Sequence, residues 1–173
     1  DHRDLHSFPT RRSSDLSPNF VWYNYRRVSA VALAHQIVAQ GRLGAIRHVR
    51  GFYLQDWAGP DVPLIWRFDK KRAGSGSHGD LNAHVVDMVR FVSGLEFTDI
   101  CGAMVETFVK ERVVQEGGAA GGIAGGMKGG GRKGRVTVDD AVLFLARMQG
   151  GALAQFEATR MAKIGRASCR ERV

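Results

Sequence analysis

The sequence predicts an α+β fold in which helices pack on one face of an open, mostly antiparallel sheet. Two segments repeat apolar residues at helical spacing, and four others show the alternation or the β-branched and aromatic content of strands. The glycine turn at residues 149–151 joins the last two strands as a hairpin, so at least that pair is antiparallel. A content of 44% apolar and 24% charged residues is typical of a globular protein.

The first half of the chain predicts a helix, a strand and a loop. Residues 29–40 carry apolar side chains on one helical face, with Ser29 as the expected N-cap and Gly41 as the stop. Residues 46–57 predict a long strand with bulky groups on both faces. We expect residues 58–78, which hold two prolines and a glycine–serine cluster, to form a loop.

The second half predicts one helix and three strands. Residues 79–93 show helical spacing and end at Gly94. Strands are expected at 97–109, 136–148 and 152–159. We expect these strands and the strand at 46–57 to form one sheet.

A glycine tract separates two of these strands. Residues 117–134 contain ten glycines in eighteen residues, a composition that cannot supply a packed core. The tract also lacks the GxxxxGK[ST] string of a phosphate-binding loop. We therefore expect a flexible loop.

The two ends of the chain read as translated adapter DNA. Residues 6–16 and 163–173 can be encoded by two strings that are reverse complements of each other over eleven residues, and the DNA resembles a common short-read sequencing adapter. Residues 1–5 continue the same adapter upstream. We therefore expect 1–16 and 163–173 to be artefacts and 17–162 to be the natural protein.

Excluding the ends changes what charge and cysteine content imply. The formal net charge of +8 falls to +5 for residues 17–162, because the C-terminal segment alone carries +3. Nucleic-acid binding is therefore not expected. No run of 18 apolar residues exists, so no membrane span is expected either. Cys101 remains as a lone cysteine, which fits a reducing, cytoplasmic location.

Residues 74–79 match the GxGxxG string of dinucleotide-binding turns and directly precede a helix. That fingerprint requires a buried strand immediately before its first glycine. Here residues 69–73 read Asp-Lys-Lys-Arg-Ala, which cannot form a buried strand. We therefore do not expect a dinucleotide site at this turn.

Asp80, His84 and Asp87 have the i, i+4, i+7 spacing of one helical face. One interpretation is a first-turn acid that complements the helix dipole together with a structural histidine. Another is an Asp–His pair in which the carboxylate orients an imidazole that moves a proton. A metal site is a third, although no second His or Cys is placed to help.

Two polar–aromatic clusters indicate ligand binding. One occupies residues 23–27, and the other consists of Trp57, Trp66, Arg67 and Lys70. Arginine and asparagine bind hydroxyls and carboxylates while Trp and Tyr offer flat apolar faces, a mixture typical of pockets for sugar-like ligands. Ordinary surface ion pairs with core tryptophans would give the same composition.

Several of these segments resemble the Gfo/Idh/MocA oxidoreductases, which are NAD(P)-dependent sugar and polyol dehydrogenases. The most specific is the glycine-rich turn followed by Asp80-x-x-x-His84. The other matching segments are residues 23–28, 41–46, 53–57, 66–70, 136–140 and 151–160. Together they cover essentially all of residues 17–162.

The resemblance implies a two-domain enzyme. In this family an N-terminal Rossmann domain binds NAD or NADP and carries a catalytic lysine, and a C-terminal domain with a large open sheet supplies the substrate pocket and often the oligomer interface. This sequence resembles only the C-terminal domain. We therefore expect residues 17–162 to be a partial substrate domain that is inactive alone, holds no cofactor or metal, and forms a homo-oligomer through its sheet.

The resemblance also implies roles for individual residues. Asp80 and His84 match the catalytic acid–base pair, with His84 as general base on a substrate hydroxyl and Asp80 orienting its imidazole. The residues expected to bind the sugar-like substrate are Asn24, Tyr25, Arg26, Trp66, Arg67 and Asp87. The competing hypothesis is a non-catalytic module that uses the same fold for ligand binding or oligomerisation.

Overall fold

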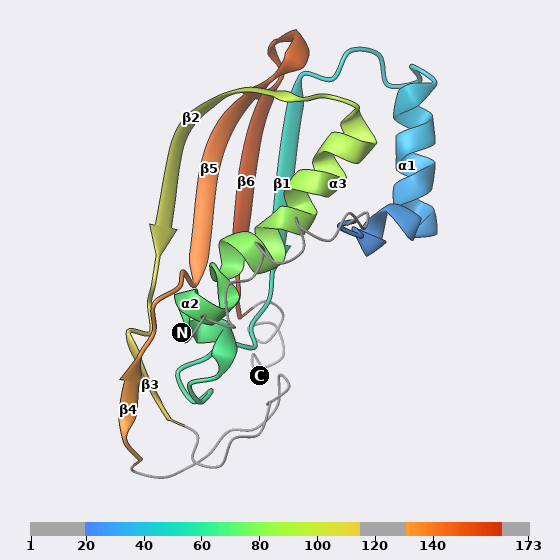
Figure 1. Ribbon diagram of the computed structural model, residues 1–173. Helices are drawn as coiled ribbons and strands as arrows, with labels where there is room; N and C mark the ends of the chain where they lie inside the picture. Colours follow the sequence, from blue (N-terminus) through green and yellow to red (C-terminus); the bar gives the residue numbers. More distant parts are fainter. Residues whose placement is uncertain (1–19, 115–130, 164–173) are drawn as a thin grey trace, which may run out of the picture.

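The protein is described by a computed structural model over residues 20–114 and 131–163. The α+β class is confirmed, with one large sheet, helices on one of its faces and a small two-stranded sheet below it (Figure 1). The adapter-like segment 1–16 lies outside the described residues, as does all of 163–173 except Lys163.

The large sheet contains four strands in the order β1-β6-β5-β2. Its strands are β1 (His48–Leu54), β2 (Phe97–Glu106), β5 (Ala141–Met148) and β6 (Leu153–Thr159). The β5–β6 and β2–β5 pairs are antiparallel and only β1–β6 is parallel, which confirms a mostly antiparallel sheet. Gly150 and Gly151 have positive φ, which only glycine adopts readily, and they make the predicted turn between β5 and β6.

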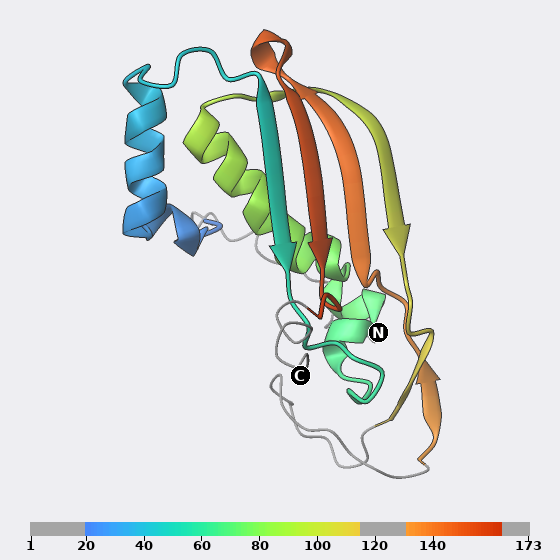
Figure 2. The same cartoon turned by 180° about the vertical axis from the view of Figure 1, so that it is seen from behind.

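Both long helices lie on the same side of this sheet, as two opposite views show (Figure 2). Helix α3 (Ala83–Ser93) crosses the sheet against β1, and α1 (Ser29–Ala39) packs on α3 beyond the β1 edge. The expected N-cap at Ser29 is wrong, because Val28 takes the cap position and Ser29 is already helical with no side-chain cap. Gly94 ends α3 in the left-handed conformation, as expected.

The main core lies between α3 and the middle strands. Phe144 of β5 and Phe156 of β6 stack with ring centroids 4.5 Å apart, and Val85 of α3 is buried beside them. Helix α3 approaches β1 most closely at Gly51, where a Cβ atom would lie 2.5 Å from Val85 Cγ1. A glycine is therefore needed at this point of β1.

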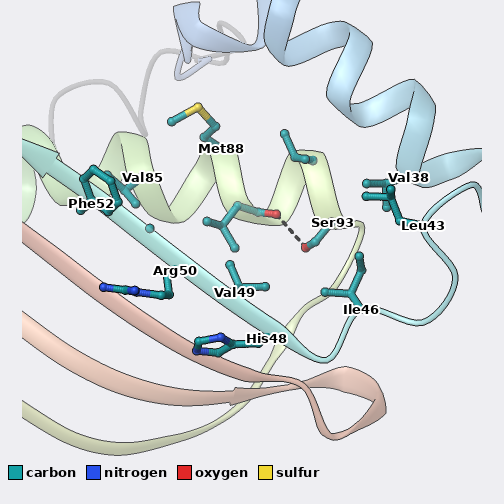
Figure 3. Close-up of a pocket in the computed structure, with 13 residues that line it drawn as sticks. Val38, Leu43, Ile46, His48, Val49, Arg50, Phe52, Val85, Met88 and Ser93 are labelled. Carbon is teal, nitrogen blue, oxygen red and sulfur yellow. Dashed lines mark hydrogen bonds between the residues drawn. The ribbon is translucent and has the colours of Figure 1, made fainter.

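An apolar groove of about 470 Å³ runs between α1, α3 and the free edge of β1 (Figure 3). Val38, Leu43 and Ile46 gather at the end near Ser93, where α3 finishes. His48, the first residue of β1, points away from α3. The groove is thus lined by both β1 and α3, and neither Asp80 nor His84 is among its lining residues.

Two expected strands are shorter in the structure than their alternation indicates. The strand expected at 97–109 ends at Glu106, since the amides of Phe108 and Val109 donate to the Asp140 carboxylate at 2.8 and 3.0 Å instead of to a neighbouring strand. Likewise, the strand expected at 136–148 begins only at Ala141. Val136 and Val138 pack in a second, smaller core with Ala58 and Phe68.

The loop and the glycine tract are also more regular than expected where they are described. Residues 58–78 contain a 3-10 turn (Trp66–Phe68) and a short helix α2 (Lys70–Ala73) that is capped by Asp69. Most of the tract 117–134 lies outside the described residues. Its end belongs to β4 (Lys133–Arg135), which pairs with β3 (Glu111–Val113). That part is therefore a strand and not an irregular loop.

The glycine turn that precedes α3 is bound to the chain's own Asp139. The Asp139 carboxylate accepts from the amides of Gly76 and His78, both at 2.7 Å, and from the Ser77 hydroxyl at 2.8 Å. Burial alone would raise the pKa of Asp139, but these three hydrogen bonds outweigh it and hold the pKa below its usual value. A Cβ atom on Gly76 would overlap the Asp139 backbone. The contact therefore fixes where the helix begins.

Within residues 20–114 and 131–163, no helix is long and apolar enough to cross a lipid bilayer.

We expect Gly51→Ala to destabilise the fold by about 1–3 kcal/mol, because the new methyl group must displace Val85 from a packed core. Gly102→Ala in β2 is the matched control, since a Cβ atom there meets nothing within 4 Å and should change the free energy of unfolding by less than about 0.5 kcal/mol. Urea unfolding of both variants measures the difference. Equal effects would show that α3 does not approach β1 as described.

We expect Asp139→Asn to lower stability at neutral pH by about 1–3 kcal/mol, because the amide cannot accept from all three donors as a carboxylate does. The pKa of Asp139 is lower in the folded chain than in the unfolded chain, where it is about 3.9. Ionised Asp139 therefore stabilises the fold fully above that unfolded pKa. This stabilisation is lost as the pH falls through the pKa of the folded state. The difference between the variant and the original protein should therefore shrink in acid unfolding curves below about pH 4. Asp61→Asn, at an exposed position, is the control and should show little change.

Candidate active site

The candidate site lies where β1 and β6 end and α3 begins. Because β1 and β6 are parallel, their C-terminal ends lie side by side, and so do Tyr53 near the end of β1 and Arg160 just after β6. The first turn of the helical segment, His78–Asn82, is a π-helix that carries Asp80, and α3 continues from it with His84. Turns of this type are rare and occur often at functional sites.

Asp80 is held by two arginines. Nη2 of Arg160 donates to Asp80 Oδ2 at 2.9 Å, and Nη1 of Arg67 lies 3.4 Å from Oδ1. Arg160 is 1% exposed, and the same nitrogen also donates to the Gly76 carbonyl at 3.0 Å. Burial lowers the pKa of Arg160, while its attraction to Asp80 opposes that change. A buried guanidinium needs such a counter-charge, so Asp80 balances the charge of Arg160.

His84 lies half-buried among tyrosines. Its ring centroid is 5.1 Å from that of Tyr25, 5.8 Å from that of Tyr23 and 6.5 Å from that of Tyr53, all in edge-on geometry. Its Nδ1 atom is buried and has no hydrogen-bond partner in the described part of the chain. The hydroxyls of Tyr25 and Tyr53 lie 2.6 Å apart and hydrogen-bond to each other. The imidazole is thus surrounded by three tyrosine rings, and one of its nitrogens has no hydrogen-bond partner among the described residues.

Among the described contacts, Asp80 makes no hydrogen bond to His84, whose imidazole it was expected to orient. Asp80 directs its carboxylate at Arg67 and Arg160 instead. The sequence spacing predicted two neighbours on one α-helical face, but Asp80 belongs to the π-helical turn and has stronger partners in the two cations. Asp80 and His84 therefore belong to the same helical segment but are not joined by a hydrogen bond among the described residues.

The remaining predicted substrate residues fall into two groups. Arg26 and Asp87 form a two-pronged ion pair, with Nε of Arg26 2.9 Å from Oδ2 and Nη2 bound to Oδ1, which ties the turn at Asn24–Arg27 to α3. The hydrogen bond to Asp87 raises the pKa of Arg26. Trp66 is 37% exposed and stacks under the Arg67 guanidinium at 4.7 Å.

These groups differ in what they offer a ligand. Tyr25 and Arg67 border the Asp80–His84 region directly. Arg26 and Asp87 use their hydrogen-bonding groups on each other. Asn24 is exposed at the start of the turn.

Sequence reasoning missed Tyr53, Arg160 and Asp139 as contributors. Tyr53 lies 28 positions from its partner Tyr25, and Arg160 lies 80 positions from Asp80, so local spacing could not pair them. A signal existed for Tyr53, whose place in the strand alternation puts it on the helix-covered face with Val49. For Arg160 and Asp139 we see no local sequence signal.

The chemistry available here is proton transfer at a neutral, hydroxyl-rich wall. Histidine is the side chain that exchanges protons most readily near neutral pH, and the Asp80 carboxylate on the preceding turn is paired with Arg67 and Arg160. Within the described ranges, no group of three or more His, Cys, Asp or Glu side chains could hold a metal ion. The amides of the glycine turn are bound to Asp139, so they do not fit the phosphates of a dinucleotide.

Comparisons with known proteins place these features in a family. Residues 31–172 match the family described as the GFO/IDH/MocA C-terminal domain. Levoglucosan dehydrogenase of Pseudarthrobacter phenanthrenivorans is 47% identical over 145 residues, which are 83% of this chain and 36% of that protein. This chain therefore spans only about a third of that relative.

Comparison with solved structures indicates the same family. An oxidoreductase domain protein from Kribbella flavida has 48% identity and a TM-score of 0.70, with 82% of this chain and 33% of that chain covered. Levoglucosan dehydrogenase in complex with NADH and levoglucosan has 42% identity and a TM-score of 0.69 over the same shares of the two chains. With the family match over most of its length, this chain belongs to the Gfo/Idh/MocA oxidoreductases and corresponds to their C-terminal domain.

Proposed function

We propose that this chain is the substrate-binding part of an NAD(P)-dependent oxidoreductase that moves a hydride between nicotinamide and a sugar, polyol or inositol-like substrate. The observation that carries the proposal is His84, which has an unpaired buried nitrogen and lies among tyrosines beside the Asp80 carboxylate. The similarity to levoglucosan dehydrogenase supports it, because that protein has been solved with NADH and levoglucosan.

In this proposal His84 is the general base. Oxidation of an alcohol requires the hydroxyl proton to leave as the hydride departs, and a free hydroxyl holds that proton too tightly at neutral pH. The imidazole accepts the proton as the hydride departs. Arg160 holds Asp80, the other member of the predicted pair, through a partly buried hydrogen bond. Tyr25, Trp66 and Arg67 contact the body of the sugar.

We propose that the nicotinamide cofactor binds to another part of the protein. When bound it accepts or donates the hydride. The only GxGxxG string of the described residues has its amides bound to Asp139, so it cannot cradle a pyrophosphate. The relatives are about three times as long as the matched segment, which leaves room for a nucleotide domain. This chain alone is then expected to bind substrate without turnover.

We also propose that a second copy of the chain covers the sheet face opposite the helices. On that face the strand register aligns Phe52, Glu157, Leu143 and Met104 in one row across all four strands. Its large exposed apolar residues are Phe52, Met104, Leu143, Leu145 and Leu153. Such a concentration of apolar side chains on one face is typical of an interface. Cys101, the one cysteine of residues 17–162, is exposed and forms no disulfide within the described residues, which fits the proposed cytoplasmic location.

A chimera tests the enzymatic proposal. Residues 20–163 of this chain replace the matching segment of levoglucosan dehydrogenase, and NADH formation is followed with levoglucosan and other anhydrosugars. We expect turnover, and we expect His84→Ala to lower kcat by about 10²–10⁴-fold because the proton then has no acceptor. The KM for the cofactor should hardly change.

His48→Ala is the matched control, because His48 is exposed on β1 and points away from α3. Its kcat should stay near that of the unmodified chimera. If His84→Ala keeps near-normal turnover, His84 is structural and the mechanism is wrong. A chimera that binds sugar without oxidising it would favour the non-catalytic binding module.

The oligomer is tested separately by sedimentation. We expect Leu145→Glu to convert the assembly to monomers, because a carboxylate in the middle of an apolar interface loses its water without gaining a partner. Leu33→Glu is the control, since Leu33 is equally exposed (56%) but lies on α1. A monomeric unmodified chain would contradict the proposed assembly.

A further inference from the structure

The chain has three tyrosines, and all of them surround His84. Two belong to elements far apart in sequence, since Tyr25 lies in the turn before α1 and Tyr53 in β1. Their hydroxyl oxygens lie 2.6 Å apart, and among the hydrogen bonds of the described residues these two hydroxyls have only each other as partners. The pair therefore has hydrogen-bonding capacity to spare.

The direction of the Tyr25–Tyr53 bond determines what that capacity is. Each hydroxyl has one proton and two lone pairs, and the mutual bond uses one proton and one lone pair. The hydrogen bond to Tyr53 is the largest cause of the raised pKa of Tyr25, followed by burial. Either hydroxyl can be the donor, and when Tyr25 donates, Tyr53 keeps its proton and Tyr25 keeps its lone pairs. In that arrangement the proton of Tyr53 and a lone pair of Tyr25 remain free.

We propose that the Tyr25–Tyr53 pair binds one alcohol hydroxyl of the substrate in a closed ring of three hydrogen bonds, which makes Tyr53 a specificity-determining residue. In this ring Tyr25 donates to Tyr53, Tyr53 donates to the substrate hydroxyl, and that hydroxyl donates to Tyr25. Hydrogen bonds in such a chain polarise one another and strengthen together. The inference rests on the proposed function, because it concerns how a polyhydroxy substrate is recognised.

The hydrogen-bonded ring distinguishes a hydroxyl of the substrate from a carbonyl or a carboxylate. A carbonyl oxygen has no proton to donate back to Tyr25, and a carboxylate would place negative charge against the Tyr25 lone pair. The neighbouring groups are Tyr23 from the same segment and His84 from α3. Arg26, the next residue along, pairs with Asp87 and so does not supply charge to the two hydroxyls. The pair therefore recognises a neutral hydroxyl at a carbon that is not being oxidised.

Tyrosine titration of the chain tests the hydrogen-bonded pair without any enzymatic activity. Tyr53→Phe keeps the aromatic side chain and removes only its hydroxyl. We therefore expect the pKa of Tyr25, measured from tyrosinate absorbance, to fall back towards the ordinary tyrosine value of about 10. Tyr23→Phe is the control and should leave the raised titration of Tyr25 in place. An unchanged Tyr25 titration in Tyr53→Phe would overturn the inference.

Substrate analogues test the ring. In the chimera we expect Tyr53→Phe to raise the KM for the sugar by about 3- to 10-fold with little change in kcat, the usual effect of one hydrogen bond. With a set of monodeoxy sugars, one analogue should show no further effect of Tyr53→Phe, because it lacks the hydroxyl that closes the ring. An equal effect on every analogue would contradict the ring.

The two tests separate this inference from the proposed function. An inactive unmodified chimera would count against oxidation of the sugar. In that case the same deoxy series, measured by calorimetric binding to the chain, still decides whether Tyr53 reads a hydroxyl.

Discussion

The site depends on one partly buried contact, the binding of the turn at residues 74–79 by the Asp139 carboxylate. Three donors of that turn converge on this carboxylate, which comes from the segment just before β5. Arg160, from the end of β6, reaches the same turn through the Gly76 carbonyl and then Asp80. Both ends of the β5–β6 hairpin therefore fix the position at which α3 begins. Because α3 carries His84, the sheet and the proposed general base are one rigid unit.

This arrangement explains why the glycine motif resembles a dinucleotide turn without serving as one. Backbone amides at such a turn form a cradle for negative charge, and any anion of suitable size can occupy it. Here the anion is the carboxylate of Asp139, which is always present at neutral pH because the hydrogen bonds that it accepts lower its pKa. A free phosphate group would have to displace a covalently tethered competitor. The turn therefore has a structural role, because it fixes the first residues of the helix that carries the proposed general base.

The sequence predicted the class of fold, the two long helices, the four strands of the large sheet and their last hairpin, because these follow from local periodicity and glycine turns. It could not predict where the strands at 97–109 and 136–148 leave the sheet, since that depends on Asp140 accepting amides from Phe108 and Val109. For the site, helical spacing predicted an Asp80–His84 pair on one α-helical face, whereas Asp80 lies in the π-helical turn before α3. Helical spacing could not predict that Arg67 and Arg160, from distant elements, would bind the Asp80 carboxylate. Contacts between residues far apart in sequence leave no trace in a local pattern.

Strand β1 joins the proposed substrate site to the proposed oligomer interface. Side chains alternate across a strand, so Val49, Gly51 and Tyr53 face α3 while Phe52 lies on the opposite face, 62% exposed. A shift of one residue in the pairing of β1 with β6 would exchange the two sets and place Phe52 against His84. Gly51 prevents this, because only a residue without a side chain fits under Val85 at that point. The same glycine thus holds Tyr53 against the site and keeps the apolar row on the face that a second copy would cover.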